Sequence, residues 1–510
     1  MKKTDALFEL IHSLTQSEKR YFKLYSSLMY PADEKRYVAL FELIEKQKEY
    51  DEKKIKERLQ LKFFAQEKRH LLLKVMECLR VYHGTHSVEG EMNAHLLEFR
   101  ICLDKSLNGL SRKALYRAKK LAQEHERFTD IIHINKLETE LLTAENNVSG
   151  LTQHIDELRK TIPGLVSKID NQLAFEKEHL GFIKWNRITE FVRSKNEQVE
   201  LDKSMQVTFL KDEKNAITFD SKIRYYYIHG LYNFLSGNFE KSAENFNKQF
   251  NCFEASPGFQ KTEKMTYARA MANAILLSLH VKDTGRFKLL LSRLEALELN
   301  STQLKEHVKY WLYIFRLMQY NQAGHFDKAL VLIKNDSKEM EELEDRFTET
   351  QTMYVERNYV LFNTLSAYIG AGDPKKALKS LNLFLNQADA DLKTDSYCMA
   401  RIIYLFIHFE LGNADLLEYN LKSTYRYLHD KQRLFRFERT VMNFIKSAIA
   451  INNKKSQVDV LKKLRDELIV LKKDPFEKNV FEYFDFISWL ESRISGKSIG
   501  EVLKLKKVRE

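Results

Sequence analysis

Residues 225–253, YYYIHGLYNFLSGNFEKSAENFNKQFNCF, have the pattern of two helices joined by a short turn. Gly237 marks the turn, because glycine adopts the positive φ that often ends a helix. Small and apolar residues recur at helical spacing on both sides: Tyr226, Gly230 and Asn233 before the turn, then Phe239, Ser242, Phe246 and Phe250 after it. Neither helix alone can hide its aromatic face from water. The stretch therefore predicts a helix-turn-helix unit that stacks on further units.

The same register occurs five times along the chain. In each copy a glycine is followed by apolar or small residues two, five and nine positions later, as in Gly324-x-Phe326-x-x-Ala329-x-x-x-Ile333. The five glycines are Gly237, Gly285, Gly324, Gly372 and Gly412. A weaker copy comes earlier, with Gly109, Ser111, Ala114 and Ala118. Five occurrences in one register predict a tandem helical repeat.

Three of these turns, GNFEKSAENF, AGHFDKALVLI and AGDPKKALKSL, resemble the turn and second helix of tetratricopeptide repeats. Tyr320 and Tyr368 match the family's aromatic position four residues before the turn glycine, and Ala329 and Ala377 match its small position. The units here are longer than the family's repeat of about 34 residues. Three of the five units depart from the pattern at the small position, with Ser242, Leu290 and Leu417 in place of the alanine.

The resemblance covers about residues 222–425 and implies an all-α fold, a right-handed α-solenoid of tetratricopeptide-like helix pairs. An irregular helical region is expected before the repeats. The opening segment SLTQSEKRYFKLY also resembles the start of uncharacterised repeat proteins of the Bacteroidetes, which implies no activity. We expect four parts: a helical N-terminal region (1–90), a region with a degenerate repeat and a coiled-coil-like hairpin (91–221), the repeats (222–425), and a basic helical cap and tail (426–510).

Composition agrees with a folded helical protein. The 510 residues include only 5 prolines and 16 glycines, with 44% hydrophobic and 30% charged residues. Asp5, Glu9 and His12 interrupt what would be the apolar part of a signal peptide, so we expect a cytoplasmic protein without a membrane span. The four cysteines are scattered without C-x-x-C pairing and predict neither disulfides nor a zinc site.

Two features of the first half are local. Thr15 and Glu18 have the spacing of a capping box. Further on, apolar residues alternate in steps of three and four, namely Val148, Leu151, Ile155, Leu158, Ile162, Leu165 and Ile169. Pro163 and Gly164 interrupt this seam and predict a kinked hairpin or two packed helices. Packing within the chain and a dimerising coiled coil both remain open.

Positive charge is concentrated at the end of the chain. Of the net charge of +12, residues 421–510 carry +9. Five basic residues there step by three or four: Lys422, Arg426, His429, Arg433 and Arg436. On one unbroken helix they would form a single cationic stripe able to follow a phosphate backbone or hold an acidic segment, whereas a loop at residues 429–431 would break it. The basic residues at 504–509 are expected to form a partly disordered tail.

The resemblance implies an adaptor that binds proteins in a groove lined by the first helix of each pair. The candidate groove residues are Tyr225, Tyr227, Asn233, Tyr313, Arg316, Asn363 and Arg401. The alternative is a ligand- or peptide-responsive regulator with a nucleic-acid-binding basic surface. No catalytic, cofactor or metal site is expected, because phosphate-binding loops, G-x-S-x-G and H-E-x-x-H motifs do not occur. The sequence leaves the partner and the oligomeric state open.

Overall fold

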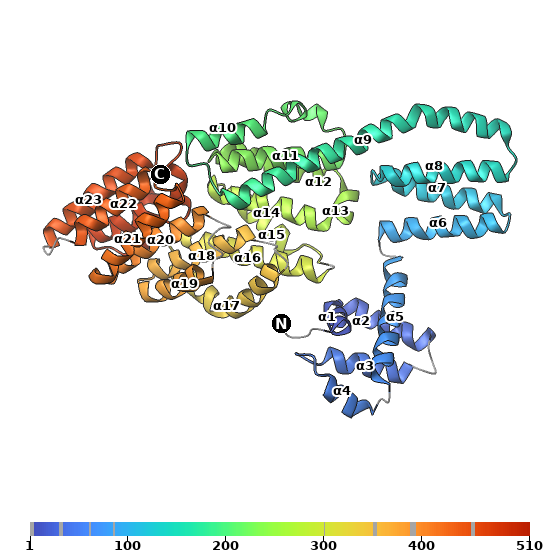
Figure 1. Ribbon diagram of the computed structural model, residues 1–510, viewed down its shortest axis with the longest axis horizontal. Coiled ribbons are helices and arrows are strands. Elements are labelled where there is room, and N and C mark those ends of the chain that lie inside the picture. The colour runs from blue at the N-terminus through green and yellow to red at the C-terminus, as the bar shows by residue number, and fades with distance from the viewer. Residues whose placement is uncertain are drawn as a thin grey trace. The chain divides into compact units, whose positions relative to one another are not determined.

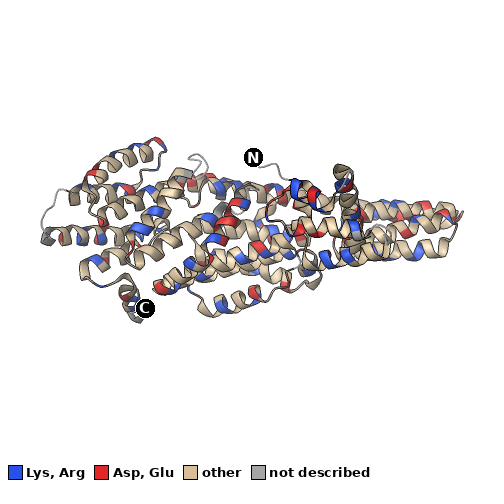
Figure 2. Cartoon of the chain, turned by 90° about the horizontal axis from the view of Figure 1, so that it is seen from below, with Lys and Arg blue, Asp and Glu red and all other residues tan. Residues whose placement is uncertain are grey.

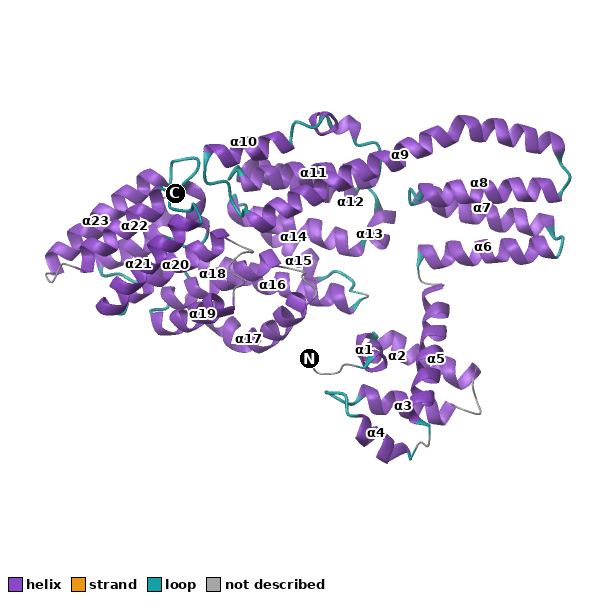
Figure 3. Ribbon diagram, viewed as in Figure 1, coloured by secondary structure: helices purple, strands orange, loops and turns teal. Residues whose placement is uncertain are grey.

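The structure, a computed structural model, describes residues 5–29, 34–60, 63–84, 87–299, 301–349, 354–387, 394–449 and 454–509. Within these ranges it contains the α-helices α1–α25 and three short 3-10 helices, with no strand (Figures 1 and 3). The predicted all-α class is confirmed. None of the helices in this part of the chain is long and apolar enough to cross a membrane.

The chain divides into two compact units. Unit 1 comprises residues 1–170, 256–264 and 298–305, and unit 2 comprises residues 171–255, 265–297 and 306–510. The first helices of unit 1 are α1 (Ala6–Ser13), α2 (Gln16–Met29), α3 (Glu34–Glu45), α4 (Glu52–Leu59) and α5 (Phe64–Gly84). They are followed by α6 (Val88–Asp104), α7 (Asn108–Glu124), α8 (Phe128–Ala144) and the start of α9 (Val148–Ile188). The short helix α13 (Pro257–Thr262) also belongs to unit 1.

The capping box predicted at the start of α2 is present. The backbone N–H of Glu18 donates to Thr15 Oγ1 (3.3 Å), and the N–H of Thr15 donates to Glu18 Oε2 (2.7 Å). This exchange satisfies two amides that the helix itself leaves unpaired. One turn later Phe22 is buried and stacks on Phe41 of α3, with ring centroids 4.6 Å apart. The cap therefore begins the helix where its aromatic face can reach the core.

Unit 2 is built mainly from helix pairs. After the end of α9 come α10 (Lys195–Ser204) and two 3-10 turns, followed by the pair α11 (Phe219–Leu235) and α12 (Phe239–Glu254). The next pairs are α14 (Lys264–His280) with α15 (Thr284–Glu295), α16 (Thr302–Gln322) with α17 (Phe326–Glu349), α18 (Tyr354–Gly370) with α19 (Pro374–Gln387), and α20 (Thr394–Glu410) with α21 (Ala414–Asp430). The unit ends with α22 (Arg436–Ile449), α23 (Lys454–Leu471), α24 (Phe486–Ser495) and α25 (Ile499–Arg509).

The same turn closes the first helix of each of these pairs. Gly237, Gly324, Gly372 and Gly412 have φ values between 68° and 79°, and each lies two residues before the next helix. The following residue donates its N–H to a carbonyl five positions back, as from Asn238 to Asn233 (2.8 Å). This left-handed cap was predicted at Gly237 and is confirmed there.

Two predicted turn positions are wrong by three residues. Gly285 lies inside α15, and the residue with positive φ is Lys282 (59°). Gly109 likewise lies inside α7, and the left-handed residue there is Ser106 (57°). A shift of three residues keeps side chains on nearly the same helix face, so the apolar pattern alone could not distinguish the two registers.

The pair α11 and α12 shows why some positions of the repeat carry small residues. Gly230 lies against the ring of Phe246, where an added Cβ would come within 2.9 Å of the ring. Ser242 is fully buried and donates its hydroxyl hydrogen to the carbonyl of Gly230 (2.8 Å). The small residues therefore let the two helices approach closely.

The predicted break at Pro163 and Gly164 does not occur. α9 runs from Val148 to Ile188 as one helix with Pro163 inside it (Figure 1). Proline has a φ compatible with a helix, but its ring crowds the carbonyl four residues earlier and it lacks one hydrogen bond, at a cost of about 3 kcal/mol. The other hydrogen bonds of this 41-residue helix and its packing against α7 and α8 offset that cost. The seam is divided between two environments: Leu165 and Ile169 pack against the core formed with α7 and α8, whereas Ile155 is exposed.

The expected disorder of the C-terminal tail is also corrected. Residues 499–509 form α25, which begins with a second capping box between Ser498 and Glu501. Ile499 and Val502 are buried. An ordered start and two buried side chains hold this basic segment as a helix.

Candidate functional site

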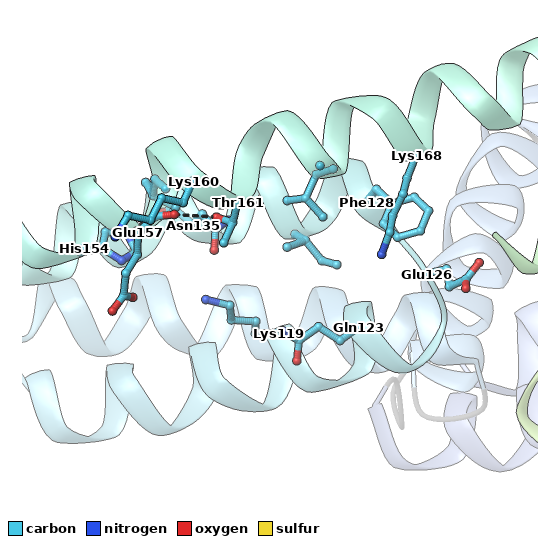
Figure 4. Close-up of a pocket in the computed structure, with 14 residues that line it drawn as sticks. Lys119, Gln123, Glu126, Phe128, Asn135, His154, Glu157, Lys160, Thr161 and Lys168 are labelled. Carbon is cyan, nitrogen blue, oxygen red and sulfur yellow. Dashed lines mark hydrogen bonds between the residues drawn. The ribbon is translucent and has the colours of Figure 1, made fainter. Parts of the chain in front are cut away.

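A groove of about 620 Å³ lies between α7, α8 and α9 within unit 1 (Figure 4). Its floor is apolar: Phe128 and Ile131 come from α8, and Leu158 and Leu165 from α9. The turn that joins α7 to α8 starts α8 at Phe128 and so sets this ring against α9. A volume of this size suits a short peptide segment or a small molecule, since ligand sites commonly measure about 300–1,000 Å³.

Three lysines surround this floor. Lys119 on α7 forms an ion pair with Glu138 (Nζ to Oε2, 2.7 Å). Lys168 on α9 extends beside Phe128, with its Nζ 5.1 Å from the ring centroid (Figure 4). Lys160 is exposed and has no ion-pair partner in the described part of the chain. The groove thus offers two ammonium groups, on Lys160 and Lys168, that no carboxylate within the described residues neutralises.

The rest of the lining is polar. Gln123, Glu126, Asn135, His154, Glu157 and Thr161 complete it. His154 Nε2 lies 3.1 Å from the carbonyl oxygen of Asn135, which fixes the imidazole across the groove from α9 to α8. Such hydrogen-bonding groups over an apolar floor can orient a bound chain while the floor supplies most of the affinity.

Gly164 keeps the groove open. A Cβ placed on this residue would meet no atom within 4 Å, so the space beside it is empty. The sequence prediction missed this site, because it placed a break at Pro163 and Gly164 where the structure has a helix. The available signal was the pair of lysines at 160 and 168 on either side of a glycine, within an otherwise apolar seam.

The seven predicted groove residues, all in unit 2, do not share one open surface. Asn233 and Tyr313 are buried. Asn233 donates its side-chain N–H to the carbonyl of His229 (2.7 Å). Tyr225 and Tyr227 are half-buried and pack against other rings, for example Tyr227 against Phe246 at 5.8 Å.

The other three residues make contacts within unit 2. Arg316 pairs with Glu295 (2.8 Å), and Asn363 Oδ1 accepts a hydrogen bond from Asn321 (3.1 Å). The guanidinium of Arg401 lies 4.6 Å from the ring centroid of Tyr427. These side chains therefore contribute to packing between helices in the structure.

The single cationic stripe predicted at the C-terminal side is broken, because α21 ends at Asp430 and α22 begins at Arg436. Arg433 is turned inward and pairs with Glu197 (2.5 Å) and Asp395 (3.2 Å). Arg436 pairs with Asp474 (3.0 Å).

The first part of the stripe stays on the surface of α21. Lys422, Arg426 and His429 are exposed, and Lys422 pairs with Glu418 (2.9 Å). In the view of Figure 2, basic and acidic residues are mixed along the helices.

A buried ionic cluster, which the sequence did not predict, lies inside unit 2. Arg193 donates to both oxygens of Glu438 (3.0 and 3.2 Å) and to Glu477 (3.1 Å), and all three residues are buried. Burial opposes the charge of Arg193, yet the two carboxylates raise its pKa. These partners lie about 250 to 280 residues apart in sequence, so no local pattern could indicate them.

Two further carboxylates extend this cluster. Glu190 accepts hydrogen bonds from Ser396 (2.5 Å), Tyr483 (2.6 Å) and Asn358. Asp395 is buried beside Arg433, and its second oxygen has no hydrogen-bond partner in the structure. Burial raises the pKa of Asp395 from 3.8 to about 7, even though Arg433 acts in the opposite direction. The cluster ties the segment between α9 and α10 to helices near the C-terminus.

Comparison with protein-family models, curated proteins and solved structures gave no match to this chain. The tetratricopeptide-like character and the Bacteroidetes resemblance therefore remain predictions from the sequence. Among the residues that the structure describes, no three His, Cys, Asp or Glu side chains are grouped so as to hold a metal ion.

Proposed function

We propose that this chain is a non-enzymatic scaffold of tetratricopeptide-like helix pairs that binds a protein partner. The groove between α7, α8 and α9 would take an acidic segment of that partner that also carries apolar side chains. The observation that supports this proposal is the arrangement of Lys160 and Lys168 above the floor of Phe128, Ile131 and Leu165.

This arrangement favours a peptide with both kinds of side chain. Removing apolar side chains from water onto the floor would supply most of the affinity. The two lysines would add attraction for carboxylates and would select against basic segments, an effect that salt weakens. The tight turns on either side of α8 support the groove with short, well-defined connections.

The alternative is a regulator that contacts nucleic acid through the basic residues near 422–436, and it has less geometric support. Arg433 and Arg436 are already paired with carboxylates, which removes two of the five cationic groups from a common surface.

The test is affinity purification of the full chain from its native host, with variants of the groove. Gly164→Leu would fill the open space, and Lys160→Glu with Lys168→Glu would reverse the charge of the rim. We expect each change to remove the same acidic partner, recovered with the unmodified chain. Gly181→Leu is the matched control, because Gly181 is also a helical glycine of α9 with no atom near an added Cβ and lies outside the groove.

Circular dichroism would verify that each variant remains folded. A partner that survives Gly164→Leu and the charge reversal to the same extent as Gly181→Leu would show that this groove is not its binding site.

A further inference from the structure

The groove of unit 1 is bridged at both ends by contacts between α9 and α8. At one end His154 Nε2 lies 3.1 Å from the carbonyl oxygen of Asn135. At the other end Lys168 extends beside Phe128, with its Nζ 5.1 Å from the ring centroid (Figure 4). From residue 154 to residue 168 the helix rises about 21 Å. The groove is therefore a space of limited length between two bridges, with open space at Gly164 between them.

The volume of the groove favours an extended segment over a helix. A helix with its side chains is about 10–12 Å across, so a length of about 21 Å fills at least roughly 1,600 Å³. The groove measures about 620 Å³. An extended chain rises about 3.3 Å per residue, so about six residues span the distance between the two bridges. A helix could place only one row of its side chains in this space.

The groove also offers a partner for the backbone of an extended segment. The N–H and C=O groups of a helix are bonded within the helix, whereas those of an extended chain need other partners. Gln123 on α7 lines the groove, is exposed, and makes no side-chain hydrogen bond in the described part of the chain. Its amide can donate to a backbone carbonyl and accept from a backbone N–H.

The two lysines without carboxylate partners set the spacing of acidic side chains in a ligand. Lys160 and Lys168 are about 12 Å apart along α9. In an extended chain, side chains four positions apart are separated by about 13 Å and point to the same side. The two side chains between them that point the opposite way would face Phe128 and Ile131 on α8. In a helix, a separation of about 12 Å would instead need acidic residues eight positions apart.

We propose that the groove binds an extended segment with two acidic residues four positions apart and apolar residues at the second and fourth of these five positions. This inference rests on the proposed function and specifies its ligand. The two carboxylates pair with Lys160 and Lys168, and the two apolar side chains pack on Phe128 and Ile131. Gln123 bonds to the backbone of the segment.

Fluorescence anisotropy of dye-labelled peptides with the purified full chain at low salt tests the spacing. The first peptide has Glu at both outer positions, Leu and Phe at the apolar positions and Thr in the centre. The second has the same composition with the two Glu adjacent. The third forms a helix, with Glu eight positions apart and Leu between them. We expect the first peptide to bind about five-fold more tightly than either of the others. Equal binding of the first two peptides, or tighter binding of the third, would overturn the proposal.

Variants of the groove test the assigned contacts with the first peptide. Lys160→Glu with Lys168→Glu should weaken its binding by about ten-fold or more, and Gln123→Ala by about five-fold. Gln66→Ala is the matched control, because Gln66 is an exposed glutamine on α5 outside the groove, and it should leave binding unchanged. Circular dichroism would verify that each variant is folded. A Gln123→Ala variant that binds as well as Gln66→Ala would contradict the extended arrangement.

Failure of this inference can be distinguished from failure of the proposed function. If the first peptide does not bind, although Gly164→Leu and the charge reversal still remove the native partner, the groove binds a protein but the extended ligand is wrong. If the first peptide binds and the charge reversal abolishes its binding, while the same variants retain the native partner, the ligand assignment holds and the partner binds elsewhere.

Discussion

Gly237 shows how a single residue serves both its own turn and a distant segment. Its φ of 68° favours glycine, and a Cβ at this position would also overlap the side-chain amide of Asn479. Lys478 donates to the carbonyl of Gly237 (2.7 Å), so the segment before α24 packs directly on this turn. The sequence predicted the positive φ, whereas the contact with Asn479 depends on the fold.

We therefore expect Gly237→Ala to be more damaging than the same change at another turn. Gly372 has a φ of 79° but open space around it, so Gly372→Ala should cost about 1 kcal/mol of backbone strain. Gly237→Ala should cost about 2–4 kcal/mol, because strain and steric overlap add. Urea unfolding of the two variants measures the difference, and equal losses would argue against the close contact with Asn479.

Asp395 gives the folded state a distinct pH dependence. Its pKa is about 7 when buried and 3.8 in the unfolded chain, so between these values the folded state holds a proton that the unfolded state releases. The contribution of Asp395 to the free energy of unfolding therefore falls as pH rises from about 4 to about 7, with a slope approaching 1.4 kcal/mol per pH unit at most.

Asp395→Asn should remove this part of the pH dependence. The variant should gain stability relative to the unmodified chain as pH rises toward 7, because asparagine has no proton to release when the chain unfolds. Thermal unfolding of both chains at a series of pH values measures the difference. If the two curves stay parallel across this range, Asp395 does not change its protonation on unfolding.

At the scale of helices, the turn between α14 and α15 can be assigned to two positions. The structure places it at Lys282, whereas the sequence pattern predicts Gly285. Lys282 holds the positive φ, so Lys282→Gly should stabilise the turn by about 1 kcal/mol. Gly285 lies in the first turn of α15, where an added Cβ would come no closer than 3.7 Å to another atom. Gly285→Ala should accordingly be neutral or stabilising.

Chemical unfolding of these two variants decides between the registers. A loss of stability with Gly285→Ala and none with Lys282→Gly would favour the position predicted from the sequence. The repeat pattern alone could not make this choice, since Phe287 and Leu290 lie on the same face of α15 in either register.

For α9, the sequence pattern predicts a helix but not which of its faces are buried. The alternating apolar residues of α9 lie on two different faces of the helix. Leu165 and Ile169 face the core, whereas Val148 and Ile155 face solvent. Apolar spacing indicates a helix without stating how many neighbours it has. Pro163 predicts a break that the structure lacks, because the effect of a proline on a helix depends on the packing around it.

Across the whole molecule, short-range sequence patterns predicted only the features that residues close together in the sequence form. The all-α class, the paired helices, the left-handed turn at Gly237 and the capping box at Thr15 follow from short-range spacing and are confirmed. The cluster of Arg193 with Glu438 and Glu477 joins residues that are far apart in sequence. The sequence did not predict the groove either, because its lining residues come from three different helices.

The central claim is that the groove of unit 1 binds a protein segment, and site-specific photo-crosslinking tests it most directly. A photoreactive side chain would replace Thr161, which lines the groove, or Arg117, which is exposed on α7 outside it. We predict that the Thr161 probe attaches to an acidic segment of one protein in the native host, and that Lys160→Glu with Lys168→Glu abolishes this product. The same crosslinked products from Thr161 and Arg117, unchanged by the charge reversal, would contradict the account.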